Sequence, residues 1–118
     1  MDEPIVHSMK LQAKYFEEIS KGIKRYEGRI FDEKRKSLNL RDIIEFTNES
    51  NDAVLRAQIT ELSFFKTFRD GLSKKDFIYV VPGANSLDKA EQTYMNIPGY
   101  REKEAEFGTI FIKFELMN

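Results

Sequence analysis

The chain has 118 residues, of which 41% are hydrophobic and 33% are charged, and its formal net charge is −1. This length fits one compact domain, residues 1–118, and leaves too little chain for a second. The absence of cysteine excludes a disulfide framework and a thiolate metal site, and the single histidine, His7, excludes a histidine-rich metal site. No leader sequence and no run of the ~20 apolar residues needed to span a membrane is present, so we expect a soluble, cytoplasmic protein without a membrane partner.

Charge is distributed unevenly along the chain. Residues 10–41 contain ten Lys or Arg and five Asp or Glu, a local balance of +5, which leaves −6 for the remainder. Such segregation predicts one basic face that attracts phosphate. The pI near 5.9 argues against strong, non-specific binding to duplex nucleic acid, so weaker and more selective binding is expected.

The first quarter of the chain predicts a short strand followed by a helix. Residues 6–11 are too few to classify by periodicity but are compatible with a strand, on which His7 is interpreted as a surface residue. Over residues 12–21 the apolar positions recur at helical spacing, while charged residues fall on the other side. Gly22 then fits a left-handed helix C-terminus, so this helix delivers the chain directly into the next segment.

Residues 22–29 (Gly-Ile-Lys-Arg-Tyr-Glu-Gly-Arg) are the candidate functional segment. Strand alternation places Arg25, Glu27 and Arg29 on one face, while Lys24 lies at the junction between loop and strand. Arginine can fork onto a phosphate or carboxylate, lysine supplies a mobile charge, and glutamate can orient a cation or accept a proton. The cluster predicts an anionic or nucleotide-like ligand. The alternative is an exposed Glu27–Arg29 pair, which would contribute only a fraction of a kcal/mol.

The middle of the chain predicts strands joined by polar turns. Residues 32–36 are interpreted as an exposed loop or hairpin tip, or alternatively as a rim that contacts phosphate. Strand character returns over 38–46, residues 47–52 favour a hairpin connection, and residues 55–60 alternate as a half-buried antiparallel strand. Most of the aromatic passage at 62–68 is expected in the core, and a base-stacking platform is the alternative.

The last third predicts small helices and a closing strand. Residues 69–76 are expected to form a short helix or loop, and the apolar run 77–81 ends at the Pro82-Gly83 turn. Ser86 is expected to cap a helix over 87–96, residues 101–106 to form a solvated charged turn, and residues 109–116 to form the final strand. The order favours an α+β fold with a curved, mainly antiparallel sheet that closes toward a small barrel. Tyr79 and Tyr94, near the Pro82-Gly83 turn, are ligand-contact candidates.

Several motifs together resemble the ASCH domain family. They are Met9-Lys10-Leu11-Gln12, Gly22-x-Lys24-x-x-Glu27-Gly28-Arg29, Leu40-Arg41-Asp42-x-Ile44-x-Phe46, Val81-Pro82-Gly83-x-x-Ser86 and Gly108-Thr109-Ile110. The resemblance implies a PUA-like β-barrel with short flanking helices and no cofactor. It also implies a cleft beside the charged strand that binds single-stranded RNA or a nucleotide or nucleoside. Lys24 and Arg29 match positions regarded as functional in the family, and Glu27 matches its usual acidic member.

The same resemblance leaves three functions open. A subset of small bacterial ASCH proteins looks like amidohydrolases of N4-acetylcytidine, in which case Lys24 and Glu27 would be catalytic here. This chain has Glu27 where that subset has its threonine nucleophile, which weakens the hydrolase interpretation. A binding module is preferred, and a coactivator-type protein-interaction domain is the third hypothesis. The oligomeric state stays open. If Lys24 and Arg29 hold phosphate, neutralising both is expected to reduce binding while hardly changing stability.

Overall fold

The computed structural model describes residues 3–117, which form strands and short helices, and most of the helical residues lie between the last two strands. The strands are β1 (Val6–Leu11), β2 (Tyr26–Ile30), β3 (Ile43–Asn48), β4 (Val54–Phe65) and β5 (Thr109–Leu116). The helices are α1 (Ala13–Ser20), α2 (Phe68–Lys74), α3 (Leu87–Met95) and α4 (Tyr100–Phe107), and two 3-10 turns are η1 (Arg35–Ser37) and η2 (Phe77–Tyr79).

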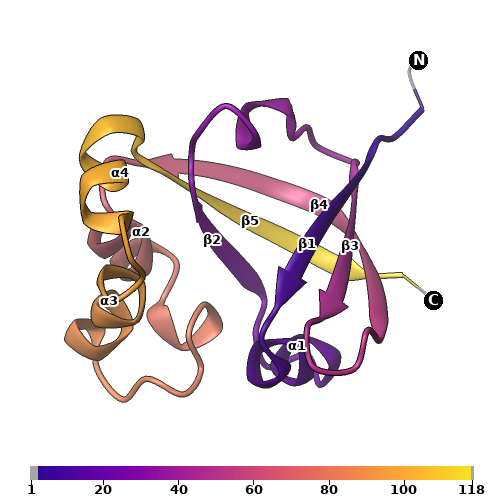
Figure 1. The fold of residues 1–118 in the computed structure, drawn as a ribbon, viewed down its shortest axis with the longest axis horizontal. Coiled ribbons are helices and arrows are strands. Elements are labelled where there is room, and N and C mark those ends of the chain that lie inside the picture. Colours follow the sequence, from indigo (N-terminus) through magenta and orange to yellow (C-terminus); the bar gives the residue numbers. More distant parts are fainter. Residues whose placement is uncertain (1–2, 118) are drawn as a thin grey trace.

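The strands form one curled sheet in the order β1-β3-β4-β5-β2. Only β1 and β3 pair in parallel, and the other three pairs are antiparallel. A register shift in the β4–β5 pair, between Ile59 and Glu61, adds the local bend expected of a bulge. The sheet therefore curls into a half-barrel with β1 and β2 as its edges (Figure 1). The predicted α+β class and the curved, mainly antiparallel sheet are confirmed.

Apolar side chains are buried on both faces of this sheet. One cluster packs α1 residues such as Phe16 and Ile19 against the inward positions of β1, β3, β4 and β5. The second cluster lies beneath α2 and α3 and is centred on the fully buried Phe68 and Phe111. Because β5 contributes Ile110 and Ile112 to the first cluster and Phe111 to the second, it is covered on both faces, as its apolar sequence requires.

Helices α2, α3 and α4 gather at one side of the molecule (Figure 1). The expected cap of α3 is present, since Ser86 Oγ accepts a hydrogen bond from the Lys89 N–H at 3.1 Å. The prediction of a charged turn over 101–106 is wrong, because this segment is α4. No buried residue occurs in α4, so it lacks the apolar stripe that periodicity detects, whereas its glutamates, lysine and alanine favour a helix intrinsically.

The segment between β2 and β3 is a crossing loop and not a hairpin. The strands β2 and β3 are not neighbours in the sheet, so residues 31–42 carry the chain from one edge strand toward the other side. The aromatic passage is largely core, as expected, although Phe64 is 56% exposed and packs edge-on against Phe31. No helix in the described residues is long and apolar enough to cross a membrane.

Candidate functional site

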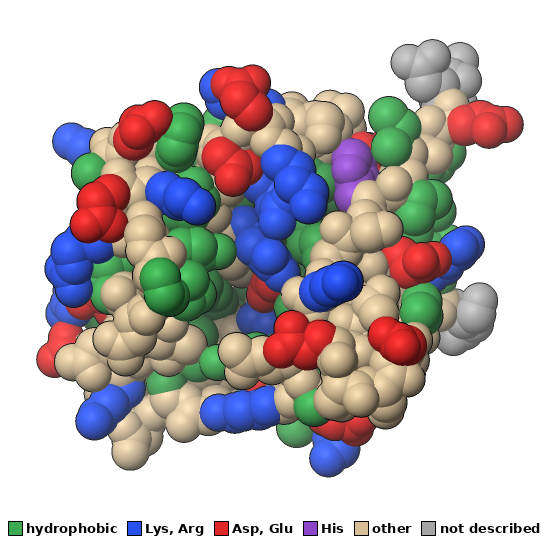
Figure 2. All heavy atoms as spheres, in the orientation of Figure 1, with side chains coloured by type: hydrophobic (Ala, Val, Ile, Leu, Met, Phe, Trp, Pro, Cys, Tyr) green, Lys and Arg blue, Asp and Glu red, His purple; other side chains and the backbone are tan. Residues whose placement is uncertain are grey.

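A cavity of about 240 Å³ opens along β2, between the two edge strands of the sheet and the α3–α4 side of the molecule. Figure 2 shows this face hollowed near its centre, with Lys and Arg side chains gathered beside and within the hollow. The lining is partly charged and partly apolar: Lys10, Leu11, Gln12, Tyr15, Lys24, Glu27, Gly28, Arg29, Glu49, Val80, Val81, Thr93, Tyr94, Ile97 and Tyr100. The cavity therefore joins the predicted charged segment to residues distant in sequence.

Lys24 lines the cavity and is 3% exposed. Its ammonium donates to the carbonyl oxygens of Tyr26, at 2.7 Å, and Val80, and forms an ion pair with Glu27 Oε1 at 3.2 Å. An ammonium has three donors, so these contacts use all of them. Burial lowers the pKa of Lys24, and Glu27 opposes that shift. Lys24 is thus a structural cation that holds Glu27 in place.

Glu27 lies between two cations and is 6% exposed. Its Oε2 accepts from Arg29 Nε at 2.9 Å and pairs with Arg29 Nη2 at 2.8 Å, while Oε1 faces Lys24. Burial alone would raise the pKa of Glu27, but Lys24 and Arg29 outweigh it and lower that pKa. A carboxylate has about four acceptor positions, so one on Oε1 is left for a ligand.

Arg29 connects the charged strand to the opposite edge of the sheet. Its Nη2 donates to the Lys10 carbonyl oxygen at 3.3 Å, which bridges β2 and β1 across the open side of the half-barrel. Within residues 3–117 the two N–H groups of Nη1 have no hydrogen-bond partner. Burial disfavours the charged form, but Glu27 raises the pKa of Arg29, which stays a cation. Arg29 thus offers donors to the cavity.

Tyr94 forms one wall of the cavity, and Gly28 makes room for it. A Cβ at residue 28 would lie 2.7 Å from Tyr94 Oη, so only glycine lets β2 and α3 approach this closely. The Tyr94 ring stacks on Phe68 with centroids 4.1 Å apart and an interplanar angle of 6°. Burial, reinforced by Glu27, raises the pKa of Tyr94 well above 10.0. The side chain is therefore a rigid, neutral wall.

The structure separates the other predicted residues from this cavity. Tyr79 lies in η2 and does not line it; instead the Arg25 guanidinium lies over the Tyr79 ring, 4.6 Å from its centroid. Arg25 is exposed and likewise does not line the cavity, although strand alternation placed it with Glu27 and Arg29. The structure thus brings together Lys24, Glu27, Arg29 and Tyr94 of the candidates.

Sequence reasoning missed part of the lining. Val80 and Val81 follow η2, Ile97 and Tyr100 flank the Pro98-Gly99 turn, and Tyr15 comes from α1. An apolar run and a tyrosine next to a proline-glycine pair were visible in the sequence, but nothing local indicated that they face one cavity.

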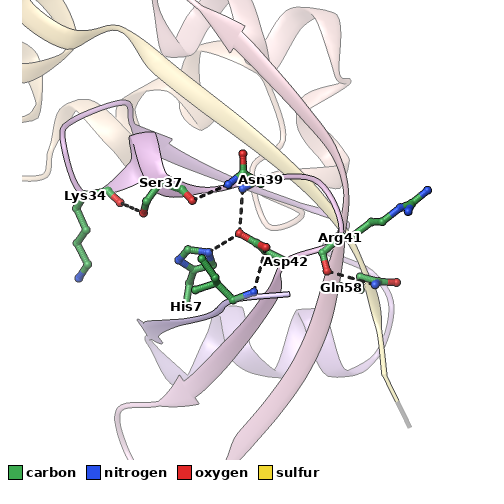
Figure 3. Close-up of polar contacts among 8 residues, drawn as sticks. His7, Lys34, Ser37, Asn39, Arg41, Asp42 and Gln58 are labelled. Carbon is green, nitrogen blue, oxygen red and sulfur yellow. Dashed lines mark hydrogen bonds and ion pairs between the residues drawn. The ribbon is translucent and has the colours of Figure 1, made fainter. Parts of the chain in front are cut away.

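His7 belongs to a separate polar cluster. Its Nε2 lies 2.8 Å from Asp42 Oδ2, and Asp42 also accepts from the N–H groups of Ile5 and Asn39 at 3.1 Å each (Figure 3). The His7 side chain is only 14% exposed, so its interpretation as a surface residue is wrong. These contacts join the start of β1 to β3. Among residues 3–117, no group of three His, Cys, Asp or Glu side chains is placed to hold a metal ion.

A curled half-barrel sheet flanked by short helices is the architecture of a PUA-like domain. Residues 9–118 match the ASCH domain family, so this chain belongs to that family. No curated protein matches the chain.

Solved structures share the fold of this chain. The crystal structure of hypothetical protein PH0355 has a TM-score of 0.86 at 29% identity, and the match covers 96% of this chain and 100% of that one. The solution structure of protein PF0455 from Pyrococcus furiosus has a TM-score of 0.79 at 29% identity, covering 97% and 99%. The ASCH domain from Lactobacillus crispatus JV V101 shares the fold, with a TM-score of 0.65 at 14% identity over 95% of this chain and 79% of that one.

Proposed function

We propose that the cavity beside β2 binds a nucleotide, either alone or as an unpaired residue of single-stranded RNA. The observation that carries this proposal is the composition of the lining. One side presents the buried Lys24–Glu27–Arg29 cluster, and the other presents apolar and aromatic side chains from α3, α4 and the segment after η2. A flat, polar-edged heterocycle needs both kinds of surface.

The hydrogen-bonding capacity left in the cluster suits the edge of a base. Glu27 retains one acceptor position, and Arg29 retains the two donors of Nη1 within the described chain. Because Lys24 and Glu27 hold each other in place, these groups are positioned before a ligand arrives, which reduces the entropic cost of binding.

The size of the cavity favours a single base over an extended strand. Its volume of about 240 Å³ lies below the range of roughly 300–1,000 Å³ common for drug-sized ligands. Neighbouring residues of an RNA would therefore remain outside the cavity, next to the Lys and Arg side chains that gather beside the hollow (Figure 2). This arrangement would give modest, salt-sensitive affinity.

Catalysis is a weaker candidate on the same geometry. A general base needs a carboxylate that can take up a proton, yet both Glu27 oxygens face cations that lower its pKa. All three Lys24 donors are already used, so Lys24 has none left for a developing oxyanion. The cluster is better suited to recognition than to hydrolysis.

The test compares two arginines of the same charged segment. The Arg29→Lys variant keeps the charge next to Glu27 but loses the planar fork, whereas Arg25→Lys makes the same change outside the cavity. Short single-stranded RNAs and ribonucleotides are titrated into each protein at low salt. We expect Arg29→Lys to weaken binding about tenfold or more and Arg25→Lys to change it less than about twofold. Equal effects of the two substitutions, or no binding by wild type, would contradict the proposal that the cavity is the binding site.

A further inference from the structure

A second, smaller hollow opens next to the cavity, with a volume of about 70 Å³. We call it the basic notch, and it is lined by Arg29, Ile30, Asp32, Arg35, Tyr100 and Lys103. Arg29 and Tyr100 also line the main cavity, so the two hollows share a wall. Its volume is several times the ~10–15 Å³ needed for one ordered water, so it accommodates a small anion.

Positive charge dominates the notch. Arg29, Arg35 and Lys103 carry three positive charges against the single carboxylate of Asp32. That carboxylate accepts a hydrogen bond from the Arg35 backbone N–H at 3.3 Å, a contact that does not involve the guanidinium. The notch is therefore a site of net positive charge with room for a negative ligand.

Arg35 differs from the other buried or half-buried Lys and Arg residues of the described chain because its guanidinium has no acidic partner. Four Lys or Arg residues in the range 3–117 are buried or half-buried: Lys24, Arg29, Arg35 and Lys75. Lys24 and Arg29 pair with Glu27, and Lys75 pairs with Glu61 at 3.3 Å. The Arg35 guanidinium forms no ion pair or hydrogen bond with any described residue.

The surroundings of Arg35 disfavour its charged form. Burial, together with the neighbouring charge of Arg29, lowers the pKa of Arg35, although Asp32 opposes this shift. A partly desolvated cation beside a like charge is costly, and an anion placed between the two guanidinium groups would remove that cost. The five N–H donors of Arg35 and the ammonium of Lys103 match the oxygens of a phosphate.

We propose that the basic notch binds the phosphate of the nucleotide whose base lies in the main cavity. This inference rests on the proposed function, because Arg29 and Tyr100 connect the two hollows into one site. The phosphate is either a terminal phosphomonoester or the phosphodiester that links two residues of an RNA. Arg35 supplies the forked contact, and Lys103 supplies a mobile charge at the rim.

The experiment measures how much a phosphate adds to affinity. Each of the common ribonucleosides, its 5′- and 3′-monophosphates and a dinucleoside monophosphate are titrated by calorimetry into wild type, Arg35→Ala and Lys34→Ala. Lys34 is the matched control because it is exposed, adjacent in sequence and absent from the notch lining. Far-UV circular dichroism checks that the variants are folded, and Lys103→Ala, on the exposed rim, provides a second variant.

We expect the phosphate to tighten binding about tenfold or more in wild type and Lys34→Ala. In Arg35→Ala this gain should shrink to less than about threefold, while affinity for the unphosphorylated nucleoside stays unchanged. If only the monophosphates bind more tightly than the nucleosides, the notch binds a terminal phosphate. If the dinucleoside monophosphate also binds more tightly, the notch binds a phosphate of the RNA backbone.

Failure of this inference is distinguishable from failure of the proposed function. Equal affinity for nucleosides and monophosphates would overturn the proposal that the basic notch binds phosphate. It would leave the proposal for the main cavity unaffected. If neither class binds, the proposed function is overturned, and titration of inorganic phosphate, followed by the NMR signals of residues 35 and 103, decides the notch separately. Saturable shifts that Arg35→Ala abolishes would support an anion site, and their absence would overturn it.

Discussion

At the scale of single residues, the burial of Lys24 changes what its substitution will do. Lys24 neutralises a buried carboxylate and satisfies two carbonyl oxygens, so its loss affects the folded state as well as binding. The expectation that neutralising Lys24 and Arg29 leaves stability unchanged is therefore replaced, because it assumed an exposed cluster.

We predict that Lys24→Met destabilises the protein by about 3–5 kcal/mol, because Glu27 loses one of its two cations and the carbonyl oxygens of Tyr26 and Val80 lose their donor. Urea unfolding at pH 7 measures the effect. Lys21→Met, an exposed lysine just after α1, is the control and should change stability by less than about 0.5 kcal/mol. Similar unfolding midpoints for the two variants would mean that the Lys24 contacts contribute no stability.

Glu27 makes stability depend on pH in the acid range. Its pKa is lowered from 4.5 in the folded protein, so its contribution is fully present above pH 4.5 and is lost as pH falls through the lower folded pKa. We expect the urea concentration at the unfolding midpoint to decrease as the pH is lowered below 4.5. This decrease should be smaller in Glu27→Gln, which is less stable than wild type from the start. Glu33→Gln, at an exposed carboxylate, should retain the wild-type slope. An unchanged slope in Glu27→Gln would contradict the prediction.

The chemistry of Glu27 also predicts little activity on N4-acetylcytidine. A carboxylate paired with two cations is a weak base, and the position of the threonine nucleophile is occupied by Glu27 itself. Following cytidine release should therefore give no more than background. Robust turnover that Glu27→Gln abolishes would show that Glu27 activates a water and would make the protein an amidohydrolase.

At the scale of elements, the packing of α2 on β5 depends on a glycine inside the helix. A Cβ at residue 71 would lie 2.2 Å from the ring of Phe111, which is fully buried and cannot move aside. Gly71→Ala should therefore destabilise by about 1–3 kcal/mol, although alanine is intrinsically the better helix former. Ser73→Ala, at an exposed position of α2, should change stability by less than about 0.5 kcal/mol. Thermal unfolding measures the stability of both variants. A Gly71→Ala variant that is more stable than wild type would contradict the close packing of α2 on Phe111.

The elements that sequence predicted correctly carry a strong periodic pattern. The strand at 109–116 and the helix beginning at Leu87 have alternating or helical apolar positions, and the structure places them as β5 and α3. The α4 segment has no buried residue, so its apolar positions show no helical periodicity, and only the helix propensity of its residues indicated a helix. The parallel β1–β3 pair was not predicted either, because pairing partners depend on the whole topology.

At the scale of the whole molecule, the site forms where distant segments meet. Spacing within residues 22–29 predicted that Lys24, Glu27 and Arg29 form a cluster, since one strand and its preceding loop supply all three. It did not predict their burial, which requires α1, α3 and the segment around Val80 to close over them. For the same reason sequence could not rank Tyr79 against Tyr94, and only tertiary packing separates them.

The proposal that the cavity beside β2 binds a nucleotide can be tested most directly with a crystal structure of the protein bound to a ribonucleoside monophosphate. We expect the base inside the cavity, with its edge within hydrogen-bond distance of Arg29 and Glu27 and its ring against the wall that contains Tyr94. A nucleotide bound elsewhere on the surface, with the cavity left to solvent, would contradict it.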